Sequence, residues 1–195
     1  MQTWKALFSI STATLLITGC SAEPGTAPAG QTSMEAPYDQ SSETAGNVRL
    51  FGEDIRTTGA DGLRIPFGST RELTETAVTA ALGEPEDRQE NAECGAGPME
   101  FTAYPGGLTL NFQDENLVGW FLREPADKER VATAEGLSVG STLTEASAVY
   151  SMDPLEDSTL GEEYATDEGI GFFTTGDDDA KQIDSLYAGT NCFFR

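Results

Sequence analysis

The sequence predicts an α+β fold of two tandem repeats, each a short helix followed by an antiparallel β-meander, with the helices packed on one face of the sheet. Two observations predict it. A stretch at 65–70 recurs at 137–142, each time as two spaced apolar residues followed by Gly-Ser-Thr, and a Leu-Thr-Glu triplet follows each copy. Behind each copy, apolar residues spaced as on a helix give way to alternating apolar and polar residues, which are typical of strands.

The first helix is predicted to begin beside Ser69-Thr70-Arg71-Glu72, which has the spacing of a capping box. Gly83 and Pro85 predict where it ends. The apolar residues between these limits fall on one helical face: Leu73, Ala77, Val78, Ala81 and Leu82.

Three alternating runs follow, at 99–104, 108–113 and 117–123. Pro105-Gly106-Gly107 and Asp114-Glu115-Asn116 separate them, so the runs predict an antiparallel meander. The side chains expected to face the helix are Met99, Phe101, Ala103, Leu108, Leu110 and Phe112.

The second repeat follows the same plan. Thr142 and Glu145 have the spacing of a capping box, and a short helix is expected to run from there through Tyr150. Its strands are expected near 160–165, 170–175 and 183–187.

The run 117–123 is apolar on both faces, and so is the pair Phe172-Phe173 in the second repeat. A one-sided core explains only one of these faces. Either the other repeat covers the second face, or that face displays aromatic side chains to a protein partner. The second possibility predicts a partner-binding face made of Tyr104, Asn111, Trp120, Phe121 and Phe173.

The beginning of the chain has the pattern of an export signal, with a positive charge at Lys5 and a largely apolar stretch at 6–17. The stretch is too short to predict a membrane span. Ile17-Thr18-Gly19-Cys20 resembles the bacterial lipobox, in which a peptidase cleaves before the cysteine. The resemblance implies a lipoprotein signal peptide at 1–19 and two or three hydrocarbon chains, such as palmitate, on Cys20, which would anchor the protein stably.

An ordinary signal peptide cleaved near Ala22 or Ala27 is the alternative. In the lipobox interpretation, a serine rather than an aspartate after the cysteine implies the outer membrane, facing the periplasm. Residues 20–46, rich in small and polar side chains, predict a flexible tether. The folded domain is expected at 47–195, with repeat one at about 60–125 and repeat two at about 126–195.

The chain carries 33 acidic and 11 basic side chains, a formal charge of −22. This charge repels nucleic acid and favours a soluble monomer, so we expect no nucleic-acid partner. A heavily solvated surface explains the acidity, and a dedicated cationic partner is the alternative.

The sequence contains no histidine, which excludes Ser-His-Asp and Cys-His catalysis and most zinc and copper sites. The acidic run Asp177-Asp178-Asp179 lacks the spacing of an EF-hand loop, so we expect a solvated turn there rather than a calcium site. No cofactor, metal or catalytic residue is predicted.

Three cysteines are present. If Cys20 carries lipid, Cys94 and Cys192 remain as an even pair in an oxidising compartment, and we predict a disulfide between them. Two free buried thiols, or a metal-binding pair, are the alternatives.

A helix and meander in tandem is similar to the repeat of the β-lactamase inhibitor protein family. Single copies resemble the small outer-membrane lipoprotein of the barrel-assembly machinery, whose helix pattern is matched by Thr74, Val78, Leu82, Gly83 and Pro85. The resemblance implies a similar fold and, weakly, inhibitory activity.

We therefore expect a lipid-anchored, non-catalytic envelope protein that binds another protein, or supports envelope assembly, through its sheet face. The alternatives are an inhibitor of a secreted hydrolase, or a carboxylate-dependent hydrolase of cell-wall or glycan material that uses acids such as Glu100 or Glu115.

Overall fold

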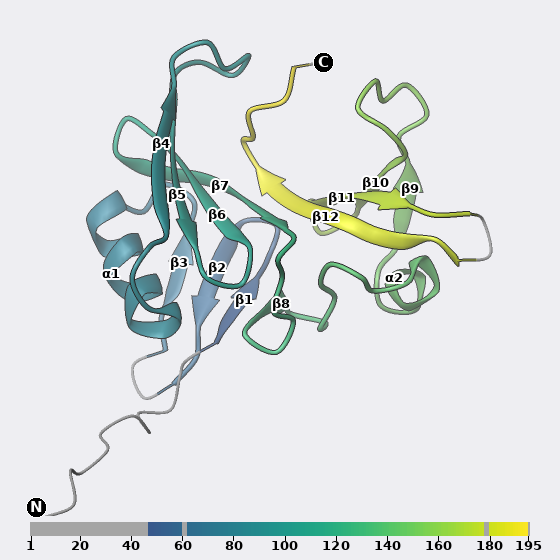
Figure 1. The fold of residues 1–195 in the computed structure, drawn as a ribbon, viewed down its shortest axis with the longest axis horizontal. Coiled ribbons are helices and arrows are strands. Elements are labelled where there is room, and N and C mark those ends of the chain that lie inside the picture. The colour runs from purple at the N-terminus through teal and green to yellow at the C-terminus, as the bar shows by residue number, and fades with distance from the viewer. Residues whose placement is uncertain (1–46, 60–61, 178–179, 195) are drawn as a thin grey trace, which may run out of the picture. The chain divides into compact units, whose positions relative to one another are not determined.

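The computed structural model describes residues 47–59, 62–177 and 180–194. These residues form twelve strands and two helices, and the strands make one sheet of four and one of eight (Figure 1). The predicted α+β fold, in which helices pack on a single repeated sheet, is therefore wrong, because the described part of the chain is mainly β and holds a second sheet. That sheet comes from short strands within 48–66 and at 131–133, which are too brief to show a clear alternation in the sequence.

The small sheet has the order β3-β2-β1-β8. Its strands are β1 (Val48–Leu50), β2 (Asp54–Thr57), β3 (Arg64–Pro66) and β8 (Val131–Thr133). The first three strands are antiparallel neighbours, whereas β8 pairs with β1 in parallel. Its buried apolar side chains belong to the core that it shares with the large sheet.

The large sheet is antiparallel throughout, with the order β4-β5-β6-β7-β12-β11-β10-β9. One half consists of β4 (Asp87–Asn91), β5 (Met99–Tyr104), β6 (Leu108–Gln113) and β7 (Asn116–Arg123). The other half consists of β9 (Met152–Pro154), β10 (Glu163–Thr166), β11 (Ile170–Thr175) and β12 (Gln182–Gly189). The last strand of each half, β7 and β12, pair at the centre.

Each half of the large sheet is preceded in the chain by a helix, α1 (Arg71–Leu82) or α2 (Leu143–Val149). The capping box predicted for α2 is confirmed: Thr142 and Glu145 exchange side-chain and backbone hydrogen bonds. For α1, the cap is Thr70 rather than Ser69, since the Thr70 hydroxyl accepts from the Leu73 N–H.

One face of the large sheet packs on the core, and we call it the inner face; the opposite side is the outer face. The small sheet and α1 share this core with the inner face. Trp120 on β7 is fully buried there, and its indole Nε1 donates to the Phe51 carbonyl at 2.8 Å. The hydrogen bond ties β7 to the turn between β1 and β2.

The inner side chains of β6 are those expected, Leu108, Leu110 and Phe112. On β5 the prediction is wrong, because Thr102 and Tyr104 point inward while Phe101 and Ala103 lie on the outer face. The Thr102 hydroxyl donates to Glu75 on α1 at 2.7 Å. A polar residue can thus occupy the inner face when the helix supplies its partner.

Candidate binding face on the eight-stranded sheet

The last described residues, 190–194, lie against the outer face of the large sheet, and we call them the C-terminal strap. The Thr190 N–H donates to the Val118 carbonyl on β7 at 2.8 Å. The Asn111 side chain on β6 donates to the Thr190 carbonyl at 3.0 Å and to Asn191 Oδ1 at 2.8 Å. A buried amide on β6 therefore holds the strap in place.

The strap approaches the sheet closely because β7 has a glycine below it. A Cβ on Gly119 would lie 2.6 Å from the carbonyl oxygens of both Ala188 and Thr190, which is closer than any side chain tolerates. Gly189, where the strap leaves β12, has a φ of +69°, a conformation that glycine adopts without strain.

The strap carries Cys192, whose sulfur lies at disulfide-bonding distance from that of Cys94 in the loop between β4 and β5. The two Cα atoms are 5.2 Å apart, within the usual range for a disulfide. The Asn91 side chain donates to the Cys192 sulfur at 3.5 Å. The end of the strap is thereby tied to the β4–β5 loop, in the half of the sheet that contains β4 to β7.

Phe193 of the strap packs on three aromatic rings of the outer face. Its ring centroid is 4.9 Å from that of Tyr187, 5.6 Å from that of Phe173 and 6.1 Å from that of Phe121, each in edge contact. We call these four residues the aromatic cluster. All four are half-buried. The outer aromatic side chains of β7 and β11 are thus partly covered by the strap, which follows β12.

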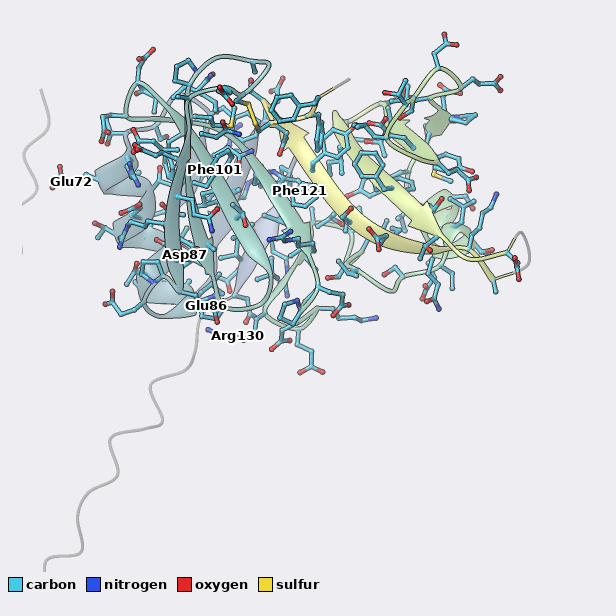
Figure 2. All side chains as sticks on the ribbon, turned by 45° about the horizontal axis from the view of Figure 1, so that its top comes forward. Glu72, Glu86, Asp87, Phe101, Phe121 and Arg130 are labelled. Carbon is cyan, nitrogen blue, oxygen red and sulfur yellow. A yellow bond between two sulfur atoms is a disulfide. The ribbon has the colours of Figure 1, made fainter. Side chains whose placement is uncertain are left out.

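A cavity of about 400 Å³ lies beside the aromatic cluster, over β4 to β7. Figure 2 shows Phe101 and Phe121 on the outer side of these strands. The cavity is lined by Asp87, Gln89, Asn91, Phe101, Ala103, Thr109, Asn111, Phe121, Arg123, Asn191, Cys192, Phe193 and Phe194. Phe194 is 63% exposed, so the aromatic wall of the cavity is open to solvent.

Of the five residues predicted for the partner-binding face, three lie on the outer face of the large sheet. Asn111 and Phe121 line the cavity, and Phe173 lies in the aromatic cluster. Tyr104 and Trp120, however, are buried on the inner face and take no part in that surface. Tyr104 points inward because its hydroxyl reaches the Glu75 carbonyl of α1, at 3.3 Å.

The lining residues that sequence reasoning missed include Phe101, Arg123, Phe193 and Phe194. The apolar character of Phe101 predicts a place on the core face, whereas its side chain lies on the outer face. For the two strap residues, the available signal was their position directly after Cys192, since a disulfide to Cys94 fixes them near the sheet.

The two acids considered for hydrolysis, Glu100 and Glu115, lie away from this cavity, around Arg71 at the start of α1. Arg71 pairs with Glu100, with Glu75 at 3.0 Å and with Glu115 at 3.8 Å. Arg88 of β4 also pairs with Glu75, at 3.0 Å. The group joins α1 to β4 and β5.

Burial by itself would raise the pKa of Glu75, but hydrogen bonds from Arg88, Thr102 and Arg71 outweigh it and lower the pKa from 4.5 to about 2. Glu75 therefore remains ionised at neutral pH. A general acid in glycoside hydrolysis needs the opposite, a raised pKa. The arrangement fits a structural ion-pair cluster.

No three His, Cys, Asp or Glu side chains gather as a metal site within the described residues. None of the helices in that part of the chain combines the length and the apolar character that a membrane span requires. Cys20, the signal peptide, the tether, and Asp178 and Asp179 of the acidic turn lie outside the described residues.

Comparison with models of protein families, with curated proteins and with solved structures finds no match to this chain.

Proposed function

We propose that this protein is a lipid-anchored, non-catalytic component of the bacterial envelope that binds a protein partner through the outer face of its eight-stranded sheet. The observation that carries the proposal is the solvent-open cavity beside the aromatic cluster. Aromatic side chains supply much of the binding energy at protein interfaces, especially beside a concave surface.

The chemistry of the cavity favours binding over hydrolysis. Glycoside hydrolysis by carboxylates usually needs two of them facing one space. Among the described residues, Asp87 is the one acid that lines the cavity. Its carboxylate already accepts from the Gln89 side chain at 2.6 Å and from the Arg88 N–H at 2.8 Å. The cavity thus offers contact surface and hydrogen-bonding groups, with no acid pair.

The anchor is proposed on the lipobox at Ile17-Thr18-Gly19-Cys20. Lipid on Cys20 and a tether at 20–46 would hold the domain near the outer membrane, facing the periplasm, while leaving it free to meet a partner. We expect labelled palmitate to enter the wild-type protein and to be absent from Cys20→Ala. Label in the Cys20→Ala protein at the wild-type level would refute the anchor.

Partner binding is tested by site-specific crosslinking in intact envelopes. A photoreactive phenylalanine analogue replaces Phe194, which is 63% exposed at the cavity, or Leu73, which is 49% exposed on α1. The proposal predicts a protein adduct from position 194 that is missing from position 73. Equal adducts at both positions, or none above background at 194, would contradict it.

A further inference from the structure

One cationic side chain in the cavity lacks an ionic partner. Arg123, the last residue of β7, is exposed at the cavity and forms no ion pair within the described part of the chain. Five other basic side chains in that part do form ion pairs: Arg56, Arg64, Arg71, Arg88 and Lys181. The chain has 33 acidic residues, and an arginine that forms an ion pair with none of the described ones is available to an anion from outside.

Three of the neighbouring polar groups of the cavity already have hydrogen-bond partners. The Asn111 amide holds the strap, and the Asn191 amide donates to the Ala188 carbonyl at 3.0 Å. Asp87 accepts two hydrogen bonds from its own strand. The guanidinium of Arg123 is therefore the charged group in the lining that remains open to a ligand.

Beside the polar side chains of Gln89, Asn91 and Thr109, the remaining lining is mainly aromatic. Phe101 and Phe121 come from the sheet, and Phe193 and Phe194 come from the strap. Flat rings on two sides suit an aromatic or aliphatic group, which prefers offset or edge contacts with such rings. The volume of about 400 Å³ lies at the lower end of the range for ligand cavities.

We infer that the cavity binds a segment of the protein partner in which an aromatic side chain stands beside a carboxylate, with the ring against the four phenylalanines and the carboxylate on Arg123. The inference rests on the proposed function and specifies the chemistry of the same site. A planar guanidinium group and a carboxylate can form two parallel hydrogen bonds with each other.

The test uses the full-length chain in lipid nanodiscs, with empty nanodiscs as the blank. Three probes are titrated by ligand-detected NMR: N-acetylphenylalanine, its uncharged amide, and N-acetylglycine. The first carries both ring and carboxylate, and each of the others lacks one of them. We expect the first probe to bind and the other two to bind at least about fivefold more weakly, since each loses one contact.

Two variants, each of which removes one positive charge, distinguish a contact at Arg123 from the overall electrostatic effect of the protein's charge. Arg123→Gln should weaken binding of N-acetylphenylalanine by about tenfold, because a charge-assisted contact is lost. Lys128→Gln, at an exposed lysine outside the cavity lining, should change it by less than about twofold. Equal affinity for the acid and its amide, or equal effects of the two variants, would overturn the inference.

A failure of this test is distinguishable from a failure of the proposed function. If position 194 still crosslinks a partner while the probes do not bind, the outer face binds a protein by other chemistry. If N-acetylphenylalanine binds but no adduct forms at position 194, the cavity binds a carboxylate ligand and the proposal of a protein partner is refuted.

Discussion

At the scale of single residues, Glu75 shows how a charged side chain can hold a helix to a sheet. Its carboxylate meets Arg71 of its own helix, Arg88 of β4 and Thr102 of β5. The side chain is 18% exposed, so solvent screens these contacts only in part. The lowered pKa of about 2 means that the folded state favours the ionised form more than the unfolded chain does.

The sign of the pH dependence follows from this shift. Stability from Glu75 is fully present above its unfolded pKa of 4.5 and is lost as the pH falls toward about 2. Allowing for screening, the contribution is about 1 to 2 kcal/mol. We expect Glu75→Gln to lower the free energy of unfolding by this amount at pH 7, measured by urea denaturation.

Between pH 4.5 and 2, the gap between wild type and Glu75→Gln should close. Glu86→Gln is the matched control, because Glu86 is exposed and its substitution removes one negative charge, as Glu75→Gln does. A constant gap across this pH range, or an equal loss in the Glu86 variant, would contradict the role given to Glu75.

At the scale of elements, the C-terminal strap depends on two kinds of contact. Asn111 and the Val118 carbonyl hold its beginning, and the link between Cys192 and Cys94 holds its end. The two cysteines are 98 residues apart, so the chain-entropy model gives a disulfide here a large effect on the unfolded state.

We expect the double variant Cys94→Ser, Cys192→Ser to lose about 2 to 4 kcal/mol of unfolding free energy. Hydrogen exchange should also quicken at the strap amides while those of β6 stay protected. Wild-type protein unfolded under reducing conditions is the control and should lose a similar amount. An unchanged denaturation midpoint in the variant would show that the bond adds no stability.

Some elements could be predicted from the sequence because local features define them. The runs 99–104 and 108–113 are bounded by turn residues and alternate clearly, and they form β5 and β6 at those positions. Strands of three or four residues, such as β1 and β8, give no such pattern. Their parallel pairing joins segments about 80 residues apart, which no local signal records.

At the scale of the whole folded region, the site combines parts that are distant in the sequence. Phe101, Phe121 and Phe193 lie on β5, β7 and the strap, and they meet at one cavity only after β7 pairs with β12. The sequence indicated an aromatic surface, but it placed Trp120 there because alternation alone does not say which face is inside. Hydrogen bonding of Trp120 to Phe51 settles that choice.

The central claim is that the outer face binds a protein partner, and crosslinking at position 194 in intact envelopes tests it most directly. Mass spectrometry would quantify the adducts from a photoreactive residue at Phe194 and, in parallel, at Leu73. We predict one dominant protein adduct from position 194, whose yield falls in the Arg123→Gln background, and background yield from position 73. Equal yields from the two positions, or no adduct at 194, would contradict the claim.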